Sequence, residues 1–173
     1  MDGRDLAGPQ AVATFGRVED EAIAGRSSAT LLITAAHGNV ESLARRIHLA
    51  GRPALPFVQA SARDLPIEPV TLQETCSRLL DAVGGGSMLL TSVEEMPLPV
   101  QDVFLELLAD LRSARNPSAT ATVRLIAGTT VSLLDCIATG TFSERLFYRL
   151  NVIHLIVPTN ASPVVPPVTR FEG

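Results

Sequence analysis

Leu31-Leu32-Ile33-Thr34 and the loop after it, Ala35-Ala36-His37-Gly38-Asn39-Val40-Glu41, decide the fold of this chain. The first three residues are apolar, and the segment ends in the β-branched pair Ile33-Thr34, which is typical of a buried strand. A helical pattern over residues 42–48 follows the loop, and this order of strand, loop and helix is the setting of a phosphate-binding loop. A working loop needs several glycines, whose backbone N–H groups surround a phosphate, and a lysine for the terminal phosphates. This loop has one glycine and no lysine, so we predict that its phosphate chemistry is lost.

The composition describes a globular chain of one domain. Its 173 residues are 46% hydrophobic and only 18% charged, and a chain of this length buries about 70% of its unfolded surface. The net charge of −4 argues against non-specific nucleic-acid binding, which needs clustered basic residues. Low charge predicts apolar surface patches, which often mark contacts with protein partners. Every basic residue apart from the histidines is arginine, so no lysine is present to hold a phosphate or form a Schiff base.

The cysteine pattern and the absence of apolar spans indicate a cytoplasmic protein without metal. Cys76 and Cys136 are far apart, lie outside any metal-binding spacing and have apolar neighbours, so we expect two core residues in a reducing compartment. No run approaches the roughly 18 apolar residues of a membrane span, and no secretion signal opens the chain. We therefore expect no metal, no membrane partner and no cofactor.

Apolar runs alternate with helical patterns along the chain. The runs are continuous rather than alternating, which predicts strands that are covered on both faces of a parallel sheet. Such an order predicts an α/β domain with right-handed crossovers. The five expected strands cover residues 30–34, 56–60, 87–93, 122–129 and 152–157. The expected helices cover residues 40–50, 71–83, 99–113, 133–138 and 143–150, and a capping box is expected at Thr71 and Glu74. Around this core of residues 30–158 we expect a loosely held N-terminal arm (1–29), with a short helix over 18–24, and a proline-rich tail (159–173).

Five separated segments carry a resemblance to a known family. They are, in chain order, 32–34 with 43–48, 56–58, 85–90 with 95–101, 123–129 and 142–153. The last contains Phe142-Ser143-Glu144-Arg145-Leu146-Phe147-Tyr148-Arg149-Leu150-Asn151-Val152-Ile153, which is similar to an arginine-finger segment almost throughout. In this order the segments resemble the AAA+ ATPase domain of bacterial enhancer-binding activators, the sigma-54 interaction domain. The resemblance implies a three-layer, P-loop NTPase-like core with a five-stranded parallel sheet.

The departures from the family pattern fall on its nucleotide-binding residues. The family loop reads G-E-S-G-T-G-K-E, and the matching His37-Gly38-Asn39-Val40-Glu41 places Val40 at the lysine position. The family's Walker B strand ends in Asp-Glu, which hold magnesium and activate water, whereas Thr91 and Ser92 stand here. Thr130 replaces the sensor asparagine. Of the two family arginines that reach a neighbouring subunit's phosphate, the first is Ser143 and the second remains as Arg149.

Two family elements are also expected to be missing. No long sigma-factor-binding loop with G-A-F-T-G-A lies between residues 62 and 85, and the helical lid over ATP has no counterpart. We therefore predict a module without ATP hydrolysis that binds protein, either itself or a larger transcriptional regulator. The resemblance leaves an ATP-binding, sigma-54-dependent activator domain as the alternative, and a decayed gene product as a third. Arg149 either pairs with a carboxylate of its own fold or reaches a partner.

Other titratable residues are assigned structural roles. His37 is expected to be exposed in its loop, and His48 to act as a cation at a helix end, where the helix dipole favours positive charge. His154 alternates with apolar neighbours and is expected to pack in a strand or lie at its edge. Glu94 and Glu95 are expected in a solvated loop, although adjacent carboxylates also suit acid–base chemistry. The three histidines have no metal-binding spacing.

Overall fold

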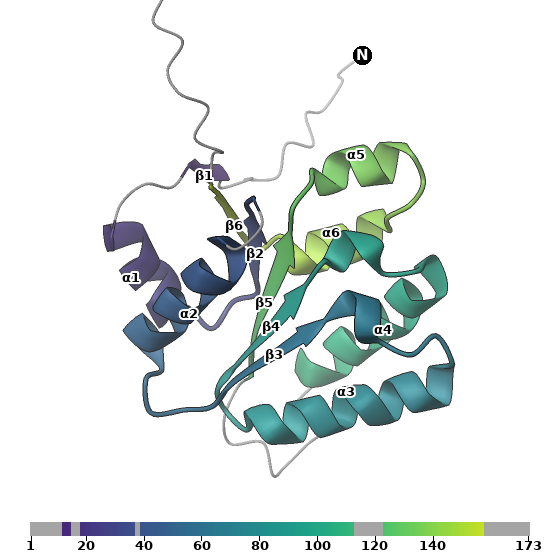
Figure 1. Ribbon diagram of the computed structural model, residues 1–173, viewed down its shortest axis with the longest axis horizontal. Helices are drawn as coiled ribbons and strands as arrows, with labels where there is room; N and C mark the ends of the chain where they lie inside the picture. Colours follow the sequence, from purple (N-terminus) through teal and green to yellow (C-terminus); the bar gives the residue numbers. More distant parts are fainter. Residues whose placement is uncertain (1–11, 15–17, 37–38, 113–122, 158–173) are drawn as a thin grey trace, which may run out of the picture.

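A computed structural model of the chain describes residues 12–14, 18–36, 39–112 and 123–157. The described chain forms three layers, a parallel sheet with helices on both faces (Figure 1). One face carries α1 (Val18–Arg26) and α2 (Asn39–Gly51), and the other carries α3 (Pro69–Val83), α4 (Leu98–Arg112) and α6 (Glu144–Leu150). None of the helices in these ranges is long and apolar enough to span a bilayer. The predicted α/β class is confirmed.

The sheet has six strands rather than the predicted five, in the order β1-β6-β2-β5-β4-β3. Their bounds are Val12–Thr14, Leu31–Thr34, Phe57–Ser61, Ser87–Thr91, Arg124–Thr129 and Ile153–Ile156 for β1 to β6. All neighbours pair in parallel, and Leu31 lies between Ile126 and Ile153. The additional strand, β1, contains only three residues and pairs with β6. The sequence did not reveal β1 because so short a segment has no apolar run of its own.

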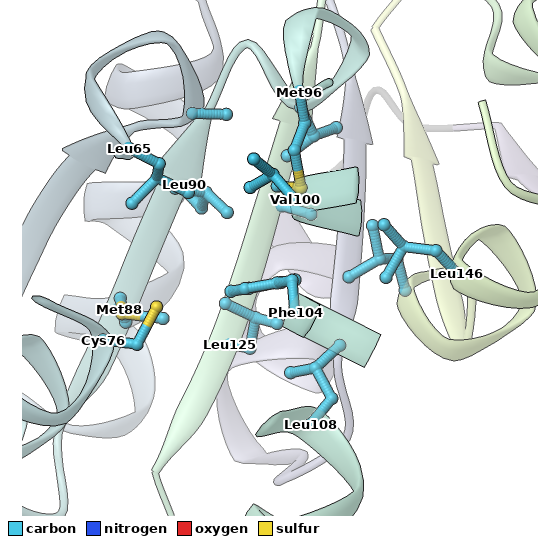
Figure 2. Packing of buried hydrophobic residues seen from close by; sticks show 14 of the residues in the cluster. Leu65, Cys76, Met88, Leu90, Met96, Val100, Phe104, Leu108, Leu125 and Leu146 are labelled. Carbon is cyan, nitrogen blue, oxygen red and sulfur yellow. The ribbon is translucent and has the colours of Figure 1, made fainter. Parts of the chain in front are cut away.

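Alternating side chains of the central strands form two hydrophobic cores. Leu31 and Ile33 face α1 and α2, whereas Leu32 faces the helices on the opposite side. Figure 2 shows the second core, in which Phe104 of α4 lies beside Leu125 of β5. Because both faces are covered, β2 and β5 are buried throughout their apolar residues, which accounts for their continuous apolar sequences.

Helix boundaries follow the predicted patterns, with one different cap. α3 begins at Pro69 rather than Thr71, and its N-cap is Glu68, whose carboxylate accepts a 2.7 Å hydrogen bond from the backbone N–H of Thr71. The predicted Thr71 and Glu74 capping box is therefore wrong. Proline at the first helical position supplies the required φ, and the cap residue lies just before it. The short helices η1 (Ala62–Asp64), η2 (Val93–Glu95) and α5 (Leu133–Ala138) complete the described chain.

The N-terminal helix α1 belongs to the core, contrary to the expectation of a loosely held arm over residues 1–29. Arg124 of β5 is fully buried and donates to the backbone carbonyls of Ala24 and Gly25 in the last turn of α1. Gly25 meets Gly51 of α2 so closely that a Cβ on Gly51 would lie 1.8 Å from the Gly25 carbonyl oxygen. Burial, with Arg52 as a second cause, lowers the pKa of Arg124 to about 10. The arginine remains a cation at pH 7, where the C-terminal end of a helix favours positive charge. The predicted tail, 159–173, lies outside the described residues.

Candidate functional site

The carboxyl ends of β2, β4 and β5 bring most of the predicted site residues together. One cavity is lined by five of the predicted residues, Val40, Glu41, Thr91, Ser92 and Thr130, together with Gly128 and Thr129. Parallel strands end at the same edge of a sheet, which is the usual ligand position in open α/β folds. The volume of this cavity is about 30 Å³, enough for about one water molecule. Two further predicted residues, His37 and Gly38, lie outside the described residues, and Asn39 begins α2.

Val40 fills the position at which the family has lysine. It is the second residue of α2, is 4% exposed and belongs to the core beneath α1 and α2. Its partner is Gly128 of β5, where an added Cβ would lie only 2.4 Å from Val40 Cγ1. The absence of a side chain at Gly128 therefore makes room for the valine. Burial of a valine side chain stabilises a fold by about 1.5–3 kcal/mol.

The end of β4 carries hydroxyls in place of carboxylates. Thr91 Oγ1 donates a 3.4 Å hydrogen bond to the Ala60 carbonyl oxygen of neighbouring β3, and thus joins two strands. Ser92 follows in the left-handed region, at φ 54° and ψ 41°. Such a backbone conformation in a residue other than glycine costs on the order of 1–3 kcal/mol. Neither side chain carries the negative charge that holds magnesium.

Glu94 contacts the site in a way that the sequence pattern did not reveal. Its Oε1 accepts hydrogen bonds from the backbone N–H of Thr130 at 3.1 Å and from Thr130 Oγ1 at 2.9 Å. Its Oε2 is buried and has no hydrogen-bond partner among the described residues. The expected solvated loop is therefore wrong for Glu94, which joins η2 to the end of β5. Its neighbour Glu95 does lie at the surface, in an ion pair with Arg63.

The charges around the cavity are negative. Glu41 lies in the first turn of α2, and its Oε2 is buried without a hydrogen-bond partner among the described residues. The carboxylate of Glu94 holds Thr130, one of the cavity-lining residues. None of the seven described residues that line the cavity is a cation. A polyphosphate placed here would meet two carboxylates and no countercharge from this lining.

The described histidines have structural positions, and both cysteines are free thiols, with Cys76 buried as expected and Cys136 only half-buried. His48 is buried, with Nδ1 2.9 Å from Ser87 Oγ and Nε2 3.1 Å from the Leu55 carbonyl oxygen. A carbonyl can only accept, so Nε2 carries the proton and Nδ1 accepts from the serine. Desolvation lowers the pKa of His48, so the expected cation at a helix end is a neutral, hydrogen-bonded ring. His154 lies within the sheet, with Nε2 2.8 Å from Thr34 Oγ1, and its pKa is also lowered by burial. No group of three or more metal-binding side chains occurs within the described ranges.

The segment that resembles the arginine finger forms α6. Ser143, at the position of the first family arginine, caps this helix, since its Oγ accepts a 3.4 Å hydrogen bond from the Leu146 N–H. Arg149 lies in the last turn and is partly exposed. It forms neither a hydrogen bond nor an ion pair with any residue that the structure describes. Pairing with a carboxylate of its own fold is thus not observed among those residues.

Known proteins share both the sequence and the fold. The family described as the sigma-54 interaction domain matches residues 71–156. The regulatory protein AtoC of Escherichia coli is 33% identical over 81% of this chain and 34% of its own length. The sigma54-dependent transcriptional activator SfnR of Pseudomonas putida is 31% identical over 75% of this chain and 40% of its own. This chain therefore spans about a third of the length of the curated relatives it matches.

Solved structures share the fold of this chain. NtrX of Brucella abortus in complex with ATP is similar to 81% of this chain and 35% of its own length, with a TM-score of 0.66 and 29% identity. The shared fold is that of the three-layer P-loop NTPases.

Proposed function

The chain belongs to the sigma-54 interaction domain family, and we propose that it is a regulatory module without ATP hydrolysis. Its role is to bind a protein, either another copy of itself or a larger regulator of bacterial transcription. Relatives that are transcriptional activators support a role in the regulation of transcription and a cytoplasmic location beside the transcription machinery. The proposed role requires no cofactor, metal, membrane or direct contact with nucleic acid.

The packing of Val40 against Gly128 is the observation that carries this proposal. The valine methyl group occupies the space above β5, and the cavity beside it measures about 30 Å³. Small-molecule sites commonly measure about 300–1,000 Å³, so the observed cavity is about tenfold too small for a nucleotide. Binding would require α2 to move away from the sheet and lose the buried contacts of Val40.

The chemistry of the cavity supports the same proposal. Phosphoryl transfer depends on positioned countercharges, a metal and an oriented water molecule. Thr91 and Ser92 supply none of these charges, and the two nearby carboxylates, Glu41 and Glu94, oppose a triphosphate. Loss of one stabilising group costs roughly 10²–10³ in rate, and here several are replaced together.

Nucleotide binding and hydrolysis are tested separately. A ligand at a hundredfold excess over its dissociation constant stabilises a fold by about 2.7 kcal/mol, so a thermal-shift titration with Mg²⁺-ATP gives a clear answer. We expect no shift and no phosphate release above buffer. The positive control is NtrX of Brucella abortus, which was solved with ATP. A saturable shift and steady phosphate release would contradict the proposal.

A second candidate function is that of an ATP-binding activator domain. The likeness to NtrX in complex with ATP favours it, as does the carboxylate of Glu94, which lies beside Thr130 where a water molecule could be activated. Under this function, Glu94→Gln removes the general base and abolishes phosphate release. Under the proposed function, wild-type and variant proteins release phosphate at the same background rate.

Arg149 is proposed as a contact with the protein partner. It makes no hydrogen bond or ion pair among the described residues, and the family uses an arginine at this place to reach a neighbouring subunit. The partner group that it meets is either a phosphate bound to a competent activator or a carboxylate of another protein.

A further inference from the structure

A groove with a volume of about 750 Å³ lies between α4 and α6. We call it the α4–α6 groove. Its lining residues are Asp102, Leu105, Glu106 and Ala109 from α4, and Arg145, Tyr148 and Arg149 from α6. The two helices pack side by side on the face opposite α1 and α2 (Figure 1). The groove is separate from the small cavity at the strand ends.

Opposite charges line the two sides of the groove. Asp102 and Glu106 are four residues apart, so they share one side of α4 and form an acidic ridge. Arg145 and Arg149 have the same spacing on α6 and form a basic ridge. No ion pair within the described residues joins the two ridges. Each ridge therefore presents charge to whatever enters the groove.

Buried hydrogen bonds fix the position of α6 relative to α4. The side chain of Gln101 is fully buried and donates to the carbonyl oxygens of Met96 at 2.7 Å and Thr141 at 3.0 Å. Its Oε1 accepts a 2.7 Å hydrogen bond from the N–H of Ser143, the residue that caps α6. The amide thus ties the first turn of α4 to the start of α6. A groove held in this way is formed before a partner arrives, which lowers the cost of binding.

An aromatic side chain stands beside the basic ridge. Tyr148 lies on α6 between the two arginines and is 59% exposed, although its ring contacts Phe147 edge to face. Leu105 and Ala109 supply the apolar part of the groove. Tyrosine and arginine are among the side chains that are enriched at the energetic centres of protein interfaces.

We propose that the α4–α6 groove binds a second copy of this chain in a two-fold symmetric dimer. The inference rests on the proposed function, since it names the partner and the surface of that protein-binding module. In a two-fold interface both copies use the same surface, so a contact from residue i of one copy to residue j of the other is repeated from j to i. The acidic ridge of each copy then faces the basic ridge of the other, so the same contact between ridges forms twice and every ridge has a partner of opposite charge. A partner that carries only one sign of charge would match only one of the two ridges. The presence of both signs in the groove therefore favours association with a second copy of the chain.

The test is sedimentation velocity of the full chain over a range of concentrations. One variant carries Asp102→Arg with Glu106→Arg, so both of its ridges are basic; the other carries Arg145→Glu with Arg149→Glu, so both are acidic. We expect a reversible wild-type dimer that weakens as salt rises, because exposed charges are screened. Each variant alone should dimerise at least tenfold more weakly. An equal mixture of the two should recover the wild-type dimer affinity, because each basic ridge then meets an acidic one.

A control separates this surface from general changes of charge. Arg78→Glu reverses an exposed arginine on α3, which does not line the groove, and should leave dimerisation unchanged. Circular dichroism melting of each protein verifies the fold, since all substituted ridge residues are at least partly exposed.

Several outcomes would overturn the proposal. A monomer at every concentration would do so, as would a dimer that neither variant weakens, or weakened variants whose mixture stays monomeric. Binding only to an ATP-loaded activator would also overturn it and would assign Arg149 to a neighbour's phosphate. These results are independent of the Mg²⁺-ATP titration, so failure of the dimer leaves the proposed absence of hydrolysis intact.

Discussion

A methyl group added to Gly128 should destabilise the protein, and a second substitution at Val40 should then add little to that loss. In Gly128→Ala the new Cβ would lie 2.4 Å from Val40 Cγ1, far inside van der Waals contact. In Val40→Ala that Cγ1 is removed and the core beneath α2 loses two methyl groups. In the double variant, the methyl group added at residue 128 occupies space that Cγ1 of Val40 has left.

The structure sets the size of each effect. Overpacking a core usually costs about 1–3 kcal/mol, so Gly128→Ala should lower the free energy of unfolding by about 2 kcal/mol. Removal of two buried methyl groups at Val40 should cost about 2 kcal/mol as well. Independent effects would sum to about 4 kcal/mol, whereas we expect about 2 kcal/mol for the double variant, because residues in contact couple by about 0.5–3 kcal/mol.

Urea denaturation of the four proteins, followed by circular dichroism, measures this coupling. The slopes of the transitions should agree, so that the midpoints report stability alone. If the two losses add within about 0.5 kcal/mol, Val40 does not pack on Gly128 as described, and this contact does not close the site.

Three further predictions concern the elements around the site. Arg124→Met removes the hydrogen bonds to the carbonyls of Ala24 and Gly25, so it should cost about 1.5–3 kcal/mol and remove hydrogen-exchange protection from α1; a protected α1 would contradict this. Ser92 has a positive φ, so Ser92→Gly should be more stable in thermal denaturation than Ser92→Val by about 1–3 kcal/mol, and equal melting temperatures would refute the assigned strain. Burial lowers the pKa of His48 in the folded state, so the unfolded chain takes up a proton first and the free energy of unfolding falls as the pH drops below about 6.5. His48→Gln should make this fall with pH less steep in urea denaturation at several pH values. An equally steep fall in the variant would exclude His48 as its cause.

Most of the fold was predictable because its central strands are buried on both faces. The continuous apolar runs at β2, β4 and β5 are too short for core helices, and their length fits strands that helices cover on both sides. The connection of α1 to the core was not predictable, because it depends on Arg124, which lies about a hundred residues further along the chain. The three residues of β1 pair through their backbone and leave no sequence pattern.

The site was predictable in position but not in packing. Parallel strands bring their carboxyl ends together, so Val40, Thr91 and Thr130 were expected to be neighbours, and they line one cavity. Val40 can enter the core because Gly128 of β5 leaves space for it. A pattern of adjacent residues does not reveal a contact between residues so far apart in the sequence. Glu94 and Glu95 are identical in type and adjacent, yet only the first reaches Thr130, because η2 turns the two carboxylates in different directions.

Isothermal titration of the full chain with Mg²⁺-ATP tests the central claim most directly. With Val40 packed over β5 and carboxylates beside the remaining cavity, the titration should give only the heat of dilution, while NtrX under the same conditions binds. A saturable heat of binding to this chain, lost on substitution in the loop of residues 38–41, would contradict the proposed loss of nucleotide binding.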